Sequence, residues 1–236
     1  MKTFITILVF ILVTCNAYSQ NLQLHYDFGN ERKFFTTTLE MFRPDTLGTT
    51  FWFVDFDFNS PDQQRGISMA YWEISRDFYV PFFKNLKGLK ELGLHLEYND
   101  GVQMEKLNDS LNIGYNLTST WLAGLSYPVR IGNVILGTML LYRYPRGASS
   151  ADFQFTTVWF QPVFHDKLIL TGFIDLWSQD KLYEDGKELV FQTEPQFWYA
   201  LTRHIFVGSE VEISKNFPFG PNEWKVSPTL GFKWEF

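Results

Sequence analysis

The chain has 236 residues, of which 45% are hydrophobic and 19% aromatic, and its formal net charge at pH 7 is −6. An acidic chain lacks the dense lysine and arginine that bind phosphate backbones, which argues against nucleic acid as a partner. Its mean hydropathy is only −0.13 despite the many aromatic residues. That combination suits a membrane barrel with an apolar outer band, a polar interior and aromatic girdles.

Residues 1–19 predict a secretory signal peptide. Lys2 supplies a positive charge, residues 4–13 form an apolar core, and residues 17–19 (Ala-Tyr-Ser) make a small-x-small cleavage site. Lipoprotein processing at Cys15 is the alternative, but a bulky residue stands where that cleavage prefers a small one. Cleavage before Gln20 removes the only cysteine, so we expect a mature domain of residues 20–236 without disulfides or thiolate metal sites.

The remainder of the chain is organised as strands separated by polar or Gly/Pro-rich turns. Apolar and polar residues alternate with a period of two, which is typical of strands whose faces meet different environments. The alternating segments are 22–28, 35–41, 52–58, 70–75, 92–98, 113–127, 134–144, 153–159, 168–176, 189–199, 205–213 and 224–236. No segment after residue 19 reaches the about 18 apolar residues of a spanning helix. The pattern therefore predicts an all-β protein, a transmembrane antiparallel barrel of about twelve strands.

The connections predict the orientation of the barrel. With both termini in the periplasm, the longer polar loops at 59–67, 99–111, 145–151, 178–187 and 214–223 fall on the outside, as the barrel rule expects. The stretch 77–90 interrupts the alternation at Pro81, and we interpret it as an interfacial turn or a short amphipathic helix. A secreted soluble β-barrel or sandwich is the alternative architecture.

The last thirteen residues show the pattern most clearly. Every second residue from Trp224 to Phe236 is apolar, and polar residues or glycine stand between them. The terminal Phe236 resembles the signal that outer-membrane barrels present to their insertion machinery. We therefore expect two partners for this surface, the outer-membrane lipid and the barrel-assembly machinery.

The polar face of each strand predicts the lining of the lumen. Inward carboxylates outnumber the inward cations Arg143, Lys225 and Lys233, which favours cations or hydroxyl-rich neutral solutes and disfavours anions. Aromatic side chains on the same face, including Phe173, could stack on a sugar or nucleoside. The candidate solute-binding residues are Asp27, Phe53, Asp55, Asp57, Tyr71, Glu73, His95, Glu97, Asp175, Glu194, Glu210 and Glu212. Other inward groups are Glu40, Glu91 and His25.

For each of these side chains the alternative is that it only fills a polar interior, which is the default in this fold. Asp55 and Asp57 lie on one face of one strand about 7 Å apart and need partners, and His95 stands two residues from Glu97. Neither spacing is diagnostic for a metal, and we expect no metal and no cofactor.

Sequence motifs for catalysis are missing. The chain contains no G-x-S-x-G, H-E-x-x-H or P-loop motif. A lipid acyl hydrolase needs Ser and His in hydrogen-bond reach on the lipid-facing side, and no histidine has an obvious outward serine beside it. We predict that the protein is not an enzyme, and keep an outer-membrane lipid-modifying enzyme as an alternative.

Five segments carry a resemblance to a known family: N-L-Q-L-H-Y-D-F-G (21–29), T-T-T-L-E-M-F-R-P-D (36–45), T-F-W-F-V-D-F-D-F (50–58), A-Y-W-E-I-S-R-D-F (70–78) and H-L-E-Y-N-D-G (95–101). They resemble a family of Gram-negative, Bacteroidetes-type outer-membrane proteins of unknown function. That family is similar in turn to nucleoside-specific channel-forming porins, whose barrels have twelve strands. The resemblance implies an outer-membrane location and a channel.

Together, these features predict an outer-membrane channel of a Gram-negative bacterium. Small neutral or cationic solutes, with nucleosides as candidates, would diffuse through an acidic, aromatic-lined lumen. The alternative is a closed structural or adhesion barrel that acts through its extracellular loops.

Overall fold

The computed structural model describes residues 20–29, 32–59, 66–85, 87–108, 111–181, 184–217 and 223–236. The predicted signal peptide, residues 1–19, lies outside the described residues. Within them, no helix is long and apolar enough to cross a membrane.

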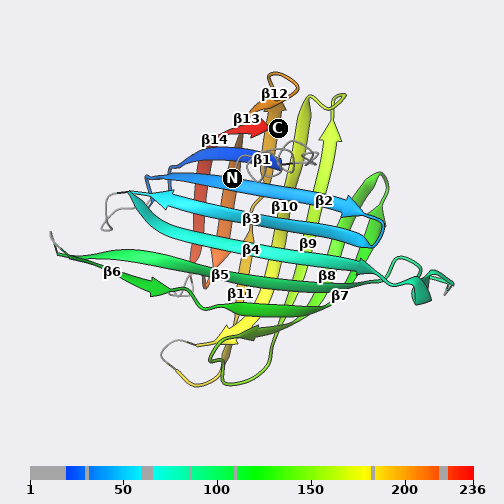
Figure 1. Cartoon of the computed structure of the whole chain (residues 1–236), viewed down its shortest axis with the longest axis horizontal. Coiled ribbons are helices and arrows are strands. Elements are labelled where there is room, and N and C mark those ends of the chain that lie inside the picture. Colours follow the sequence, from blue (N-terminus) through cyan, green and yellow to red (C-terminus); the bar gives the residue numbers. More distant parts are fainter. Residues whose placement is uncertain are drawn as a thin grey trace, which may run out of the picture.

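The described chain consists of fourteen strands and one short 3-10 helix (Figure 1). The elements are β1 (Gln20–Asp27), β2 (Phe35–Asp45), β3 (Gly48–Phe58), β4 (Ile67–Tyr79), η1 (Pro81–Asn85), β5 (Gly93–Asn108), β6 (Leu111–Asn116), β7 (Thr120–Ile131), β8 (Val134–Pro145), β9 (Asp152–Val163), β10 (Leu168–Asp180), β11 (Lys187–Thr193), β12 (Gln196–Ala200), β13 (Ile205–Lys215) and β14 (Trp224–Glu235).

The strands close into a ring of twelve. Each pairs antiparallel with its neighbours, β1 pairs with β14, and the pairing of β9 with β10 completes the circuit. Two positions in the ring are each filled by two strands, because β6 and β7 both pair with β5, and β11 and β12 both pair with β10. The prediction of about twelve antiparallel strands is confirmed. In Figure 1 strands β1–β5 cross the strands of the wall behind them at a steep angle, as strongly tilted barrel strands must.

The break between β11 and β12 has a local cause. Pro195 has no N–H to donate to the ladder, and Gly172 on the facing strand adopts φ +145°, a conformation that favours glycine. The backbone N–H of Glu194 donates to the carbonyl of Phe173 at 3.2 Å, so pairing resumes immediately beside the bulge.

The two ends of the barrel differ in their connections. At the end that holds Gln20 and Phe236, whose backbones are hydrogen-bonded at 3.1 Å, most turns are tight. Asp45, for example, accepts hydrogen bonds from the N–H groups of Leu47 and Gly48. The placement of this end in the periplasm stays a prediction.

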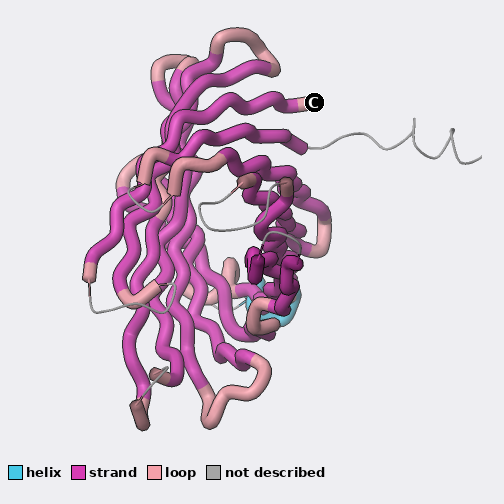
Figure 2. The backbone as a smooth tube through the Cα atoms, turned by 90° about the vertical axis from the view of Figure 1, so that its left-hand side faces the viewer, coloured by secondary structure: helices cyan, strands magenta, loops and turns pink. Residues whose placement is uncertain are grey.

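Two predicted irregular stretches are partly regular in the structure. The predicted loop 99–111 is wrong, because β5 continues to Asn108 and forms a hairpin with β6 that extends from the barrel wall (Figure 1). The stretch 77–90 begins inside β4, and η1 follows Val80. This helix, cyan in Figure 2, lies in the connection between β4 and β5.

The two faces of the wall differ in chemistry, as β1 shows. Its inward side chains, Asn21, Gln23, His25 and Asp27, are between 3% and 6% exposed, whereas the outward Leu24 is 44% exposed. The same exposed apolar surface continues around the ring, with members Leu22, Leu94, Leu96, Leu125, Leu140, Phe153, Phe155, Phe197, Tyr199, Leu230, Phe232 and Trp234. A continuous apolar surface of this size requires a lipid environment.

Candidate functional site

The strand pairings place all twelve candidate residues on the inner face of the barrel. Cross-strand partners share a face, and the register pairs Asp55 with Tyr71, Phe53 with Glu73, and Asp175 with Gln192. Binding of a solute by these residues stays a prediction. The inner face carries the following candidates: Asp27, Phe53, Asp55, Asp57, Tyr71, Glu73, His95, Glu97, Asp175, Glu194, Glu210 and Glu212.

Six of these carboxylates form a group that we name the carboxylate belt: Asp55, Glu73, Glu97, Asp175, Glu194 and Glu210. They come from opposite walls and still interact through their charges. Asp55 of β3 interacts with Glu210 of β13, and Glu73 of β4 interacts with Asp175 of β10. All six side chains are half-buried, so water reaches the middle of the lumen.

Five members of the belt are held by neutral donors. The hydroxyl of Thr38 donates to Asp55 at 2.5 Å, and that of Tyr71 donates to Glu73 at 2.6 Å. The other three bonds are Thr156 to Asp175 at 2.5 Å, Gln192 to Glu194 at 3.0 Å and Gln196 to Glu210 at 2.6 Å. Neutral donors fix the position of a carboxylate without placing an opposite charge beside it.

Positively charged side chains lie in the lumen at two described places near the belt. Arg143 stands over the Trp177 ring at 5.5 Å, and its charge interacts with Asp175. Arg32 donates to Asp27 at 3.0 Å and to Glu212 at 2.7 Å. Sequence reasoning missed Arg32 because it follows β1 in what reads as a turn. Burial opposes the charge of Arg32, but Glu212 and Asp27 outweigh burial and raise the pKa of its guanidinium further above its usual range.

His95 is 2% exposed and lies between two carboxylates. Its Nε2 is 3.1 Å from Glu97, the neighbour noted in the sequence, and its Nδ1 is 3.0 Å from Asp77. The hydroxyl of Thr49 also donates to Asp77 at 3.1 Å. Asp77 was assigned to the irregular stretch and was therefore missed. Within the described residues, no group of three or more His, Cys, Asp or Glu side chains is placed to hold a metal ion.

Asp55 and Asp57, which share one face of β3, each have a partner of their own. Each carboxylate accepts from its own threonine on β2, Asp55 from Thr38 and Asp57 from Thr36 at 2.7 Å. Glu91, expected inward, lies in the turn before β5. There the Arg130 guanidinium binds Glu91 through two hydrogen bonds of 2.7 Å and lowers the pKa of its carboxyl.

The lumen is packed with side chains near the end that holds the termini. Trp198 is fully buried and lies across the facing glycines Gly208 and Gly231, where an added Cβ would stand 2.7 and 2.8 Å from ring atoms. The Lys233 ammonium lies 4.8 Å from the Trp198 ring, and the His25 ring meets it edge-on at 5.5 Å. We name these residues the Trp198 cluster; it narrows the lumen on the side of β10, β12, β13, β14 and β1.

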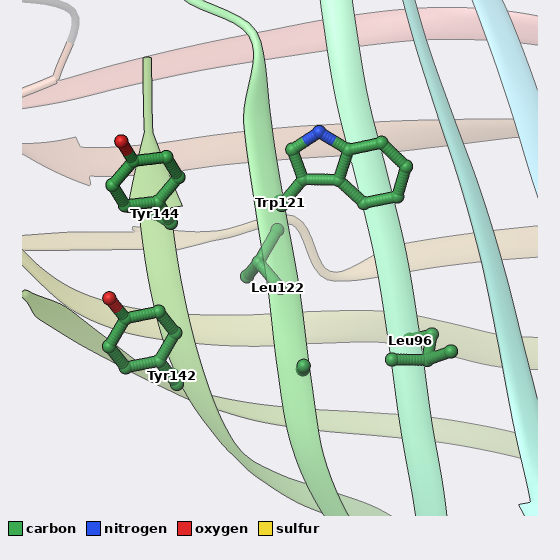
Figure 3. A pocket seen from close by; sticks show the side chains of 6 residues that line it. Leu96, Trp121, Leu122, Tyr142 and Tyr144 are labelled. Atoms are coloured by element: carbon green, nitrogen blue, oxygen red, sulfur yellow. The ribbon is translucent and has the colours of Figure 1, made fainter. Parts of the chain in front are cut away.

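The described surface also has hollows outside the lumen. One of about 420 Å³ lies on the lipid-facing wall, and Trp121, Tyr142, Tyr144 and Leu96 are among the residues that line it (Figure 3). A second of about 360 Å³, lined by Asp100 and Arg146 among others, lies at the break between β6 and β7. Because these side chains point away from the lumen or lie at its rim, neither hollow belongs to the candidate site.

Three histidines have clear partners, and none of those bonds joins a serine. His25 bonds Gln23 and Thr229, His95 bonds the two carboxylates, and His204 bonds the backbone carbonyl of Glu235. In the part of the chain that the structure describes, these contacts do not form the nucleophile–base pair that acyl transfer needs.

A closed antiparallel ring with an apolar outer surface and a polar, charged interior defines an integral outer-membrane β-barrel. The protein is therefore located in the outer membrane of a Gram-negative bacterium. Residues 19–236 match the model of a domain of unknown function, DUF5020, so the chain belongs to that family. No protein with a curated description matches it.

Solved structures share the fold at low sequence identity. The NanC porin is 9% identical, with 92% of this chain and 100% of that chain covered and a TM-score of 0.56. LpxR from Salmonella typhimurium is 10% identical over 92% and 100% of the two chains, with a TM-score of 0.49. Omp33 from Acinetobacter baumannii is 13% identical over 93% and 98%, with a TM-score of 0.45. The similarity to the NanC porin shows that the barrel is porin-like in its fold.

Proposed function

We propose that the protein is an outer-membrane diffusion channel for small cationic and neutral solutes. The observation that carries the proposal is the carboxylate belt, with half-buried acids from opposite walls held by neutral hydrogen-bond donors. A unit charge about 8 Å from a passing ion contributes about 0.5 kcal/mol in water. Six such charges attract cations into the lumen and repel anions.

Aromatic groups in the lumen support neutral solutes as well. The rings of Phe53 and Tyr71 lie 6.0 Å apart, and the Tyr71 hydroxyl is bonded to Glu73. A flat ring could stack on Phe53 while a hydroxyl group bonds Glu73. Nucleosides have both features and are the neutral solutes to test first.

Two other functions also have observations in their favour. A closed adhesion barrel is favoured by the Trp198 cluster, which fills part of the lumen, and by the exposed Leu111, Ile113 and Tyr115 on the extending hairpin. A lipid-modifying enzyme is favoured by the apolar hollow on the lipid-facing wall (Figure 3). Insertion would depend on the assembly machinery binding β14 up to Phe236.

Single-channel recording in a planar bilayer tests the proposal. The reversal potential in a KCl gradient gives the ratio of cation to anion permeability for the refolded chain and for the double variant Asp55→Asn/Asp175→Asn. Each asparagine keeps an oxygen for its threonine donor. Glu105→Gln is the matched control, because Glu105 is an exposed acid on the hairpin beyond the barrel.

We expect cation selectivity in the unmodified protein and a drop of about twofold per removed charge, from the interaction energy above. Glu105→Gln should leave the ratio unchanged. Block of the current by adenosine or uridine would support the nucleoside, and current without block would remove it. A folded barrel without current, or with anion selectivity, would refute the channel proposal.

A further inference from the structure

The inner face is not uniformly polar, and one group of its apolar side chains, which we call the apolar stripe, lies on β7, β8 and β9. Leu122 and Leu141 are buried on the inner faces of β7 and β8, which pair with each other. On β9, Val158 and Phe160 follow Thr156 at two-residue steps and therefore share its inward face. Gly137 confirms this orientation, because a Cβ there would meet the Cγ2 of Val158 at 2.9 Å.

Two side chains of this stripe are open to solvent although they point into the barrel. Phe160 is 61% exposed and Val158 is 37% exposed. They lie on β9, two places around the ring from β12 and its packed Trp198 cluster, and they leave an apolar surface open to the lumen there. A solute passing between the end with the termini and the belt can therefore contact this apolar surface.

The stripe directly adjoins the carboxylate belt. Leu122 pairs across the strands with Glu97, and Val158 pairs with Phe173, two residues before Asp175. Two residues along a strand span about 7 Å. Val158 is therefore separated from the Asp175 carboxylate by about the length of a small organic cation, and Phe160 lies two residues further along β9.

We infer that the channel prefers organic cations that carry a single positive charge on an apolar or aromatic body. This rests on the proposed channel function and names its substrate class. The cationic group lies at Asp175 and Glu97, and the apolar body covers Val158 and Phe160. Phe173 lies between Asp175 and Thr171 on β10 and adds an aromatic ring, a group that attracts cations.

The reasoning depends on two contributions that act together. The belt alone would favour every cation, including potassium, by charge. The stripe alone would favour every apolar solute by burial of surface. A solute that satisfies both at once gains from each, so its affinity exceeds that of a cation or an apolar molecule of the same size.

Block of single-channel potassium currents separates these contributions. The probes are benzyltrimethylammonium, which has charge and ring, tetramethylammonium, which has the charge only, and benzyl alcohol, which has the ring only. The variants are Phe160→Ser and, as a matched control, Phe42→Ser. Phe42 is also inward and 43% exposed, but it lies on β2, six places around the ring from β9.

We expect benzyltrimethylammonium to block at lower concentration than either of the other probes. Contact with Phe160 over about 50 Å² corresponds to about an eightfold change in affinity, so Phe160→Ser should weaken its block by about that factor. Phe42→Ser should leave it within twofold. Tetramethylammonium should be insensitive to both variants. Unchanged potassium conductance in each variant would show that the barrel is intact.

Equal block by benzyltrimethylammonium and tetramethylammonium would overturn the inference, as would block that Phe160→Ser leaves unchanged. Both outcomes would occur in a channel that is still cation-selective, so they would leave the proposed function in place. If the unmodified protein is not cation-selective, the proposed function is refuted and this inference with it.

Discussion

Trp198 provides the sharpest test of how the barrel interior is held together. The side chain is fully buried between Ile169 and Phe206, with its ring against two glycines. Replacing it with alanine removes about 150 Å² of buried apolar surface, which lowers the free energy of unfolding by about 4 kcal/mol. Cavity-forming Trp→Ala changes in other proteins fall in the range of about 3–5 kcal/mol. The variant also removes the Trp198 ring, which lies 4.8 Å from the Lys233 ammonium. Of these two ring contacts, the one with Phe206 at 5.0 Å remains.

Trp198→Ala should therefore lower the free energy of unfolding by about 4–5 kcal/mol. The assay is urea unfolding of the refolded barrel in detergent, followed by the mobility of unheated samples in gel electrophoresis. With a slope of about 3 kcal/mol per molar urea, the midpoint should fall by more than about 1 M. Trp198→Phe is the control; it keeps most of the contact and loses the bond from Nε1 to Gln196, so its loss should be about 1–2 kcal/mol.

The same variant should also change the lumen. Because Trp198 narrows the lumen near the termini, its removal should increase single-channel conductance at a given salt concentration. An unchanged midpoint in Trp198→Ala would refute the packing argument. An unchanged conductance with a lowered midpoint would show that the cluster supports the wall without narrowing the path.

Three further predictions follow from single contacts. Gly231→Ala should destabilise the barrel by about 1–3 kcal/mol in the same urea assay, because its Cβ would stand 2.8 Å from Trp198; an unaffected midpoint would contradict this. Arg32→Gln should lower stability by about 1–2 kcal/mol, since Arg32 is one-third exposed and its acid partners Asp27 and Glu212 are buried, and an unchanged midpoint at pH 7 would be the contrary result. Glu91 has a lowered pKa through Arg130, so its contribution is present above its unfolded pKa and is lost as pH falls through the folded value; in Arg130→Gln, NMR titration of the Glu91 carboxyl should show a pKa back in the usual range.

The strand pleat explains why so much of the lumen could be read from sequence. Successive side chains in a strand point to opposite faces, so one correctly assigned residue determines which face each of its neighbours is on. Phe53, Asp55 and Asp57, alternate residues of β3, all lie on the inner face for this reason. Asp27 and Glu212 were correctly placed for the same reason. Sequence alone could not show that Arg32, outside any strand, joins them.

Some apolar residues of the lumen were missed, although Phe53, Tyr71 and Phe173 were assigned to it. Trp198, Val158 and Phe160 are apolar, so periodicity alone did not mark them as part of the lumen. Their role depends on which strands stand opposite each other and on the glycine pair Gly208 and Gly231, which face each other across β13 and β14. Such contacts join residues far apart in the chain, and no local pattern records them. The prediction of a loop at 99–111 was wrong for a different reason, because its polar residues belong to a strand that extends beyond the barrel wall.

The charge of the belt itself argues that the lumen is not a dry, filled interior. Two carboxylates about 10 Å apart repel each other by about 1.7 kcal/mol at an effective dielectric constant of about 20, and six of them form many such pairs. Five of the six are bonded to neutral donors, which offset little of that repulsion. Water in the lumen would reduce it, and the half-buried state of all six side chains gives water access. A barrel built only as a scaffold would be more stable with these positions neutral, which is a further argument for the proposed cation channel.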